Sequence, residues 1–363
     1  MITQSSRRCA AVVAVAVVLA CAALLAAASA GTHPAIVRSE VLNEGAPYPQ
    51  CHASTIVEIG PGRLAAAWFG GTRERAPDVG IWVTRFEAGA WTTPVEVANG
   101  VQPDGTRHPT WNPVLFAPPG QPLMLFYKVG PSPREWWGMV KTSRDGGRAW
   151  SKARRLRAPL LGPIKNKPVI LADGAWLSPS STESEITGWR AHFERSTDRG
   201  RTWTFVGPLD KGPSILEAIQ PSILFHPDGR LQALARTRNG VLAAAWSRDN
   251  GITWSALEPT GLPNPNAGTD AITLKDGRHL LVYNHSAPPP GASSGGPRYP
   301  LIVAVSADGV SWRNVAVLED QPMPDGYAYP AVIQAADGLV HVTYTWNRQR
   351  IKHVVLDPGA LEP

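Results

Sequence analysis

The feature that most constrains this chain is an eight-residue pattern, S-x-D-x-G-x-x-W, that recurs along it. Full copies begin at Ser143, Ser196 and Ser247, a copy one residue shorter runs from Ser306 to Trp312, and a decayed copy runs from Thr84 to Trp91. Aspartate and glycine suit a tight turn, serine and threonine bond to the turn backbone, and tryptophan folds back as an apolar plug. The pattern therefore predicts a repeated turn in which the aspartates brace hairpins and are not catalysts.

A second repeat interleaves with the first, because six glycines each lie between two alternating apolar runs. They are spaced 48 to 61 residues apart, at Gly62, Gly120, Gly174, Gly229, Gly277 and Gly338. Alternation with a period of two around each glycine predicts an antiparallel hairpin. No helical stretch separates the hairpins, and 34 glycines with 35 prolines favour turns. Six such units predict an all-β, six-bladed β-propeller whose last blade is closed by an N-terminal strand near residues 36–42.

The first thirty residues are typical of a secretory signal peptide. Arg7 and Arg8 precede an apolar run over residues 10–28, and Ala28-Ser29-Ala30 has the form of a cleavage site. We therefore expect a signal peptide over residues 1–30 and one secreted or periplasmic domain over residues 31–363, with no stable membrane insertion after cleavage. An uncleaved anchor and a lipoprotein are the less favoured alternatives.

Charge and cysteine content exclude several classes of protein. Removal of the signal peptide leaves Cys51 as the single cysteine, so an internal disulfide is not expected. The net charge falls from +6 to +4, and no basic run argues for a nucleic-acid partner. The histidines show no metal-ligand spacing and no phosphate-binding loop is present, so we expect no metal or cofactor. We also expect a monomer.

Each of the six units places one polar residue just before its first apolar run. These residues are His52, Asn112, Lys167, Gln220, Asp270 and Tyr329. Because the innermost strands of a propeller begin near its central channel, the six predict a ring around a pocket; the alternative is that strand starts are simply polar. The loops after each unit's second strand carry arginines beside aromatic residues, which favours an anionic ligand with a flat apolar side, such as an acidic sugar.

The repeated pattern resembles the Asp box of the sialidase family, and the whole chain after the signal peptide is similar to bacterial sialidase-like (BNR-repeat) proteins. The resemblance implies three arginines that hold a substrate carboxylate, a tyrosine nucleophile, a glutamate that activates it, and a loop aspartate as acid/base. Ala328-Tyr329-Pro-Ala-Val is similar to the nucleophile segment. Leu234-Ala-Arg236 and Arg298-Tyr-Pro-Leu301 are similar to the segments of the second and third arginines.

The chain also departs from the family's pattern. His52 stands where the family has its first arginine, and Gln220 stands where it has the glutamate. Glu217, three residues earlier, is a substitute base, while Glu74 and Asp78 are both candidates for the acid/base. We expect substrate contacts from the following residues: Arg236, Arg298, His52, Arg73, Gln220, Lys167 and Asp270.

These observations predict a secreted exo-glycoside hydrolase of the sialidase-like type, acting on a terminal sialic acid or a related acidic sugar. A tyrosine nucleophile is a known exception to the two-carboxylate scheme of glycosidases. Two alternatives stay open. One is a polysaccharide lyase on uronate-containing glycans, in which His52 and Tyr329 move the proton. The other is a carbohydrate-binding propeller without activity.

Overall fold

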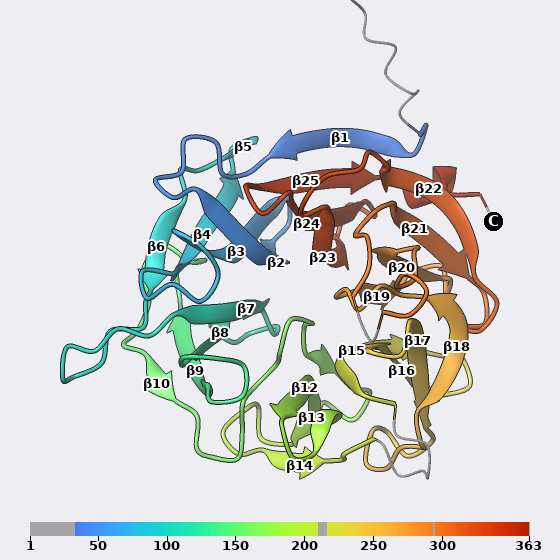
Figure 1. Ribbon diagram of the computed structural model, residues 1–363, viewed down its shortest axis with the longest axis horizontal. Helices are drawn as coiled ribbons and strands as arrows, with labels where there is room; N and C mark the ends of the chain where they lie inside the picture. The colour runs from blue at the N-terminus through green and yellow to red at the C-terminus, as the bar shows by residue number, and fades with distance from the viewer. Residues whose placement is uncertain (1–32, 210–215, 293–294, 363) are drawn as a thin grey trace, which may run out of the picture. The chain divides into compact units, whose positions relative to one another are not determined.

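The computed structural model describes residues 33–209, 216–292 and 295–362. Within these residues, six antiparallel sheets surround a central axis as the blades of a β-propeller (Figure 1). The described residues hold one short 3₁₀ turn, Pro358–Ala360, and no α-helix. The prediction of an all-β, six-bladed propeller is therefore confirmed. The predicted signal peptide lies outside the described residues, and no helix among those described has the length and apolar character to cross a membrane.

Each blade begins with an innermost strand and ends with an outermost one. Blade 1 consists of β2 (Gln50–Gly60), β3 (Arg63–Gly71), β4 (Gly80–Glu87), β5 (Ala90–Trp91) and β6 (Val95–Ala98). Blade 2 consists of β7 (Thr110–Phe116), β8 (Leu123–Val129), β9 (Trp137–Ser143) and β10 (Arg154–Arg155). Blade 3 consists of β11 (Val169–Ile170), β12 (Trp176–Ser184), β13 (Gly188–Ser196) and β14 (Thr204–Val206).

Blades 4 to 6 follow the same order. Blade 4 consists of β15 (Ala218–Phe225), β16 (Leu231–Thr237), β17 (Val241–Ser247) and β18 (Glu258–Pro263). Blade 5 consists of β19 (Asp270–Thr273), β20 (His279–Asn284), β21 (Leu301–Ser306) and β22 (Arg313–Glu319). Blade 6 consists of β23 (Tyr327–Gln334), β24 (Val340–Trp346), β25 (Arg350–Leu356) and β1 (Ile36–Val41). The six hairpin glycines lie between the first two strands of their blades, all at positive φ of 66° to 91°, a conformation that glycine adopts without strain.

The N-terminal strand closes the ring. β1 pairs antiparallel with β25, from Ile36 opposite Leu356 to Val41 opposite Lys352. The outermost strand of blade 6 therefore comes from the start of the described chain, which confirms the predicted closure. The core lies between the faces of neighbouring blades, where small residues allow close approach; one cluster joins Ala65 and Ala67 of blade 1 to Leu125 of blade 2.

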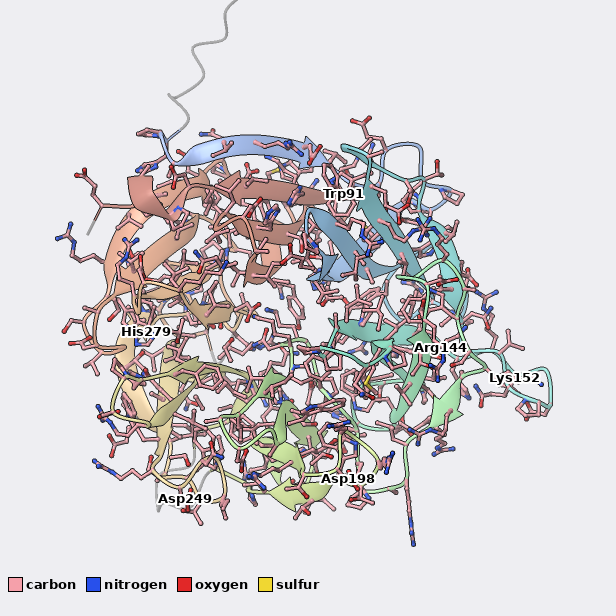
Figure 2. All side chains as sticks on the ribbon, turned by 180° about the vertical axis from the view of Figure 1, so that it is seen from behind. Trp91, Arg144, Lys152, Asp198, Asp249 and His279 are labelled. Atoms are coloured by element: carbon pink, nitrogen blue, oxygen red, sulfur yellow. The ribbon has the colours of Figure 1, made fainter. Side chains whose placement is uncertain are left out.

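The four undecayed copies of the repeated pattern, which we call Asp-box turns, share one geometry. In the first, the Ser143 hydroxyl donates to Asp145 Oδ1 at 2.7 Å and accepts from the Gly147 N–H at 2.8 Å. In all four, the tryptophan indole donates to the carbonyl of the turn glycine at 3.0–3.3 Å. Figure 2 shows Asp198 and Asp249 at the outer edge of neighbouring blades. The prediction that these aspartates brace turns is confirmed.

The decayed copy has a different function in the fold. It lacks the aspartate, and the Trp91 indole instead donates to Glu40 of β1 at 3.1 Å. The same carboxylate bonds to His353 of β25 at 2.9 Å, and His353 bonds in turn to His341 of β24 at 3.0 Å. Blade 1 is thus bonded to the closing strand of blade 6 at the place where the repeated turn is missing.

Candidate active site

A ring of six residues, one from each blade, surrounds the axis where the innermost strands begin. Its members are Ala53, Asn112, Lys165, Gln220, Gly268 and Tyr329, of which the five non-glycine residues have left-handed φ angles of 40° to 70°. Gly268 is assigned to the ring because the residue two positions after it makes the same kind of hydrogen bond as the residue two positions after Gln220. There, Ser222 accepts from a backbone N–H of blade 5, and Asp270 accepts from one of blade 6. Such backbone is uncommon for non-glycine residues, and its recurrence marks an imposed local geometry.

This ring corrects the register of the ring predicted from the sequence. Asn112, Gln220 and Tyr329 occupy the ring as predicted, whereas His52 precedes the blade 1 member by one residue. Lys167 and Asp270 lie one layer deeper, two residues beyond the ring. In blades 2, 4 and 6 a proline follows the ring residue and marks the strand start, but blades 3 and 5 lack that proline. In blade 3 a proline follows Lys167 instead, which placed the prediction two residues beyond Lys165, and in blade 5 no proline marks Gly268.

The deeper layer ties the blades together. The Asp270 carboxylate accepts from Lys167 Nζ at 2.8 Å, from the Ser222 hydroxyl at 3.1 Å and from the Val332 N–H at 2.8 Å. These bonds join blades 3, 4, 5 and 6. Because Asp270 and Lys167 satisfy one another there, the structure does not bring them into contact with Tyr329.

Tyr329 and Arg236 form the centre of the site. Arg236, on the second strand of blade 4, donates from Nη1 to the Tyr329 phenol oxygen at 2.8 Å and to Gln220 Oε1 at 3.4 Å. Arg236 Nε is buried and has no hydrogen-bond partner among the described residues. A guanidinium group in this position stabilises negative charge on the phenol oxygen and keeps a donor free for a ligand.

His52 lies against the face of Tyr329, with ring centroids 4.2 Å apart. Its Nδ1 bonds to the Thr345 hydroxyl at 2.9 Å. Burial, and then the nearby charges of Arg348, Arg298 and Arg236, hold the pKa of His52 well below its ordinary value. His52 is therefore a neutral hydrogen-bonding group near pH 7 and does not replace the charge of an arginine.

Two further arginines supply positive charge at this place. Burial lowers the pKa of Arg298. The nearby Tyr329 raises that pKa, whereas the charges of Arg348 and Arg236 lower it further. All three groups therefore lie within electrostatic reach of Arg298. Arginine stays charged in proteins. Arg348, in the hairpin between β24 and β25, was not assigned a role from the sequence, yet it brings a third guanidinium into the cluster.

Lys165 adds a buried amino group to the ring. Its ammonium group donates to the carbonyl oxygens of Thr269 and Pro330 and to Asn166 Oδ1, and it is fully buried. Burial lowers the pKa of Lys165 to about 7. A Cβ on Gly268 would lie 3.1 Å from Lys165 and 3.2 Å from Tyr329, so this glycine lets the two approach across the axis.

The acidic candidates from the sequence bond elsewhere. Glu74 forms an ion pair with Arg348. Asp78 accepts from the Thr72 backbone and hydroxyl at 2.8 and 2.6 Å; although burial raises its pKa, these bonds bring the pKa of Asp78 below its ordinary value. Glu217 accepts from the Trp189 N–H at 3.2 Å and pairs with Arg238 at 3.4 Å.

None of these three carboxylates contacts Tyr329 within the described structure. Arg73 lines a small cavity together with His52, Glu74 and Arg348, at the edge of the arginine cluster.

A cavity of about 370 Å³, which we call the axial cavity, lies next to Arg236, whose guanidinium group packs on the Trp189 ring in the cavity wall. It is lined by loops of blades 1 to 4 and by the connection into blade 5, through Arg75, Ser132, Pro133, Arg134, Glu183, Ser184, Trp189, Arg238 and Asn266. The Trp189 ring lies 5.0 Å from the Arg236 guanidinium carbon and 5.5 Å from that of Arg238. Asn266 Oδ1 is buried without a partner among the described residues. The loops after the second strands of blades 1 to 4 thus meet at one face, as predicted for all six loops.

A second cavity of about 370 Å³ adjoins the first, and we call it the outer trough. The two share Pro133, Arg134, Glu183 and Ser184. The remainder of the trough is mainly apolar and aromatic, with Trp136, Trp137, Leu156, Ala158, Pro159, Leu160 and Leu161 among its lining residues. Together the cavities form a polar, cationic chamber that continues into an apolar one.

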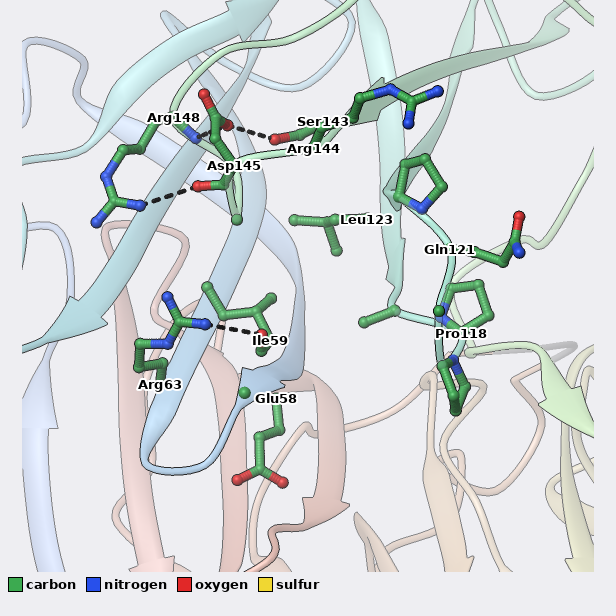
Figure 3. Close-up of a pocket in the computed structure, with 16 residues that line it drawn as sticks. Glu58, Ile59, Arg63, Pro118, Gln121, Leu123, Ser143, Arg144, Asp145 and Arg148 are labelled. Atoms are coloured by element: carbon green, nitrogen blue, oxygen red, sulfur yellow. Dashed lines mark hydrogen bonds between the residues drawn. The ribbon is translucent and has the colours of Figure 1, made fainter.

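A larger cavity, of about 620 Å³ and drawn in Figure 3, is lined by turns at the opposite end of the blades. It is formed by the lower turns of blades 1 and 2 and by the first Asp-box turn, with Arg63, Gln121 and Asp145 in its wall. Its charged groups are largely used within the fold, since Asp145 bonds to Ser143 and to Arg148 N–H groups. Its lining includes no residue that packs on Arg236, as Trp189 of the axial cavity does, so size alone does not locate the candidate active site.

Comparisons with known proteins agree with this geometry. A family model described as a BNR repeat-like domain matches residues 62–342. A curated relative, the anhydrosialidase of Macrobdella decora, is 24% identical over an alignment 242 residues long; the match covers 58% of this chain and 30% of the relative. The chain thus spans less than a third of that relative's length.

Solved structures show the same fold. The intramolecular trans-sialidase from Ruminococcus gnavus, in complex with oseltamivir carboxylate, superposes with a TM-score of 0.69 at 14% identity, covering 91% of this chain and 99% of that one. A protein of unknown function from Dyadobacter fermentans gives a TM-score of 0.70 at 18% identity, covering 89% and 98%. At these identities the likeness shows the fold alone.

Proposed function

The chain belongs to the BNR repeat-like domain family, and from the site it builds we propose that it is a sialidase-like glycosidase releasing a terminal acidic sugar. One observation carries the proposal. At the centre of the propeller, a tyrosine phenol receives a hydrogen bond from a buried arginine, which also packs on Trp189 in the wall of the axial cavity. The proposal includes export of the enzyme, which the leader-like residues 1–30 support.

The charge balance of the site favours an anionic sugar. Arg236, Arg298 and Arg348 gather around Tyr329, and Glu74 neutralises only one of them. Two guanidinium groups can hold a carboxylate through charge-assisted hydrogen bonds. His52 and Asn266 add neutral polar groups suited to hydroxyl or amide contacts. The substrate is therefore a sialic acid or a related acidic sugar.

Tyr329 is the nucleophile in this proposal. Its phenol proton passes to solvent water, Arg236 holds the charge of the resulting phenolate, and the phenolate oxygen bonds to the anomeric carbon as the bond to the leaving group breaks. Gln220 stands where a carboxylate base would be, and an amide does not take up the phenol proton. In this site, arginine stabilisation of the phenolate takes over part of the task of that base.

A panel of aryl glycosides tests the proposal. The purified protein is assayed on glycosides of N-acetylneuraminic acid, of a 2-keto-3-deoxy acid and of glucuronic acid, beside Tyr329→Phe. We expect release from at least one acidic sugar and a loss of at least about 10³-fold in the variant. Equal release by Tyr329→Phe, or no release from any of the three, would contradict the proposal.

One specific observation favours a second function, β-elimination on a uronate glycan. No carboxylate contacts Tyr329 among the described residues, and neutral His52 lies on its ring. In a lyase, arginines would neutralise the uronate carboxylate and Tyr329 would transfer the proton. The product separates the two functions, because elimination leaves an unsaturated sugar that absorbs ultraviolet light and hydrolysis does not.

A further inference from the structure

The wall between the axial cavity and the outer trough carries one carboxyl group, that of Glu183 near the end of β12. We propose that Glu183 is the acid/base of the glycosidase: it protonates the leaving-group oxygen, while the leaving group occupies the outer trough. This inference rests on the proposed function. It assigns the role to a residue that the sequence did not single out.

Position supports this assignment. A general acid must reach the oxygen that joins the bound sugar to its leaving group, so it belongs at the boundary between their two binding spaces. Glu183 lines both spaces, whereas Glu74 and Asp78 line neither of these cavities. Glu74 is paired with Arg348, and Asp78 is held by Thr72, so a change of protonation at either one would break an existing contact.

The surroundings of Glu183 suit an acid. Within the described part of the chain, its carboxyl group forms no hydrogen bond or ion pair. Burial is the largest influence on the pKa of Glu183, and it raises that pKa. The nearby charges of Arg236, Arg134 and Arg75 lower the pKa, and the charge of Glu74 raises it. The net direction is upward. A carboxyl group whose pKa is raised keeps its proton nearer to neutral pH and can donate it.

The two steps balance as follows. In the first, the Tyr329 phenolate bonds to the anomeric carbon, the carbon–oxygen bond to the leaving group breaks, and the Glu183 proton goes to the departing oxygen. In the second, the Glu183 carboxylate takes a proton from water, the water oxygen bonds to the anomeric carbon, and Tyr329 leaves as phenolate. Each residue ends as it began, and the net reaction consumes one water.

The outer trough indicates the kind of leaving group. Trp137 is half-buried in its wall, and Pro159, Leu160 and Leu161 complete an apolar surface. The apolar face of a sugar ring packs on such surfaces, while Arg134 and Arg155 at the trough offer donors to hydroxyl groups. The structure therefore favours a substrate whose acidic sugar is linked to a further sugar.

The test compares Glu183→Gln with the unchanged protein on two substrates of the same acidic sugar. One has a nitrophenyl leaving group, which departs without protonation, and the other has a sugar leaving group, which does not. We expect single-turnover cleavage of the sugar-linked substrate to fall about 10²- to 10³-fold in the variant, and that of the aryl substrate to fall less than about tenfold. Glu183→Asp should restore part of the lost rate.

Matched controls separate the inference from the proposed function. Glu44→Gln, at an exposed carboxylate that lines neither cavity, should cleave both substrates at the unchanged rate. If Glu183→Gln keeps full activity on the sugar-linked substrate, or loses both substrates equally, Glu183 is not the acid and the glycosidase assignment stands. If Glu74→Gln or Asp78→Asn shows the leaving-group dependence instead, the acid is that residue. Silence of the unchanged protein on both substrates overturns the function and the inference together.

Discussion

The outer turns and the axial ring differ in how the sequence builds them. At the outer edge, four copies of one pattern make one structure, and each is held by bonds within its own eight or fewer residues. At the axis, six blades supply six positions with the same backbone geometry but different side chains. The side chains of the outer turns are the same because each turn makes the same hydrogen bonds. The side chains of the ring differ because each ring residue makes different contacts.

The difference teaches where stability and chemistry reside. The serine, aspartate and indole N–H of an Asp-box turn bond within that turn, and its tryptophan ring packs in the core, so we expect a substitution there to act by destabilising the fold. The axial residues contact partners far away in the chain, as Arg236 does with Tyr329 across 93 positions. Substitutions should therefore separate cleanly: outer variants change unfolding, and axial variants change catalysis.

The largest effect is expected at an outer tryptophan. Trp254 is 6% exposed and stacks on Phe193 with ring centroids 4.4 Å apart. Trp254→Ala leaves a cavity between blades and should lower the free energy of unfolding by about 3–5 kcal/mol. Denaturant unfolding measures this. Ile252→Ala, an exposed change in the same turn, is the control; an equal loss there, or a folded Trp254 variant with an inactive site, would break the comparison.

Arg236→Gln should change catalysis more than the free energy of unfolding. It removes the donor to Tyr329 and a charge from the cluster, so we expect kcat/KM to fall about 10²- to 10³-fold. The free energy of unfolding should change less than in Trp254→Ala. Arg230→Gln, in the hairpin turn at the other end of the same strand pair, should leave kcat/KM unchanged. If unfolding changes more than catalysis, Arg236 belongs with the structural residues.

The contact between blades 1 and 6 offers a further test of the outer edge. There the Asp-box turn is missing, and Trp91, Glu40 and the pair His341–His353 form the hydrogen bonds instead. Burial, with His353 beside it, lowers the pKa of His341 to about 4. The unfolded chain binds this proton near pH 6.5, so stability is full above that pH and falls as the pH drops toward 4.

The contribution of His341 to this acid loss is up to about 3 kcal/mol. His341→Gln should flatten the dependence of unfolding free energy on pH between 6.5 and 4. His108→Gln, at a histidine away from the closure, should leave the slope as it is. An unchanged slope in His341→Gln would remove the closure from the pH-sensitive parts of the fold.

The smallest effect is expected at the outer trough. Trp137→Ala should raise KM for a sugar-linked substrate about 2- to 10-fold, as removal of an aromatic packing surface does, and leave KM for a small aryl glycoside nearly unchanged. Steady-state kinetics on both substrates measures this. Phe205→Ala, on an outer strand of blade 3, is the control. Equal rises for both substrates would place Trp137 away from the leaving group.

The fold was predictable because its signals are local. The serine, aspartate, glycine and tryptophan of each turn bond within one turn, so their spacing alone predicted the structure. The site was predictable where a proline followed the ring residue, as at Gln220 and Tyr329. It was not predictable in blade 3, where the proline follows Lys167 and the ring residue is Lys165. Arg348 and Glu183 emerge only when loops of different blades meet, because no spacing within one blade brings them to the site.

The most direct test of the central claim is to look for a covalent bond between Tyr329 and the sugar. The protein is mixed with an activated fluorinated glycoside of the acidic sugar it cleaves, quenched, and analysed by intact and peptide mass spectrometry. The account predicts one added sugar on the peptide that contains Tyr329, and no addition in Tyr329→Phe. Turnover with no adduct on Tyr329, or an unsaturated product in its place, would contradict it.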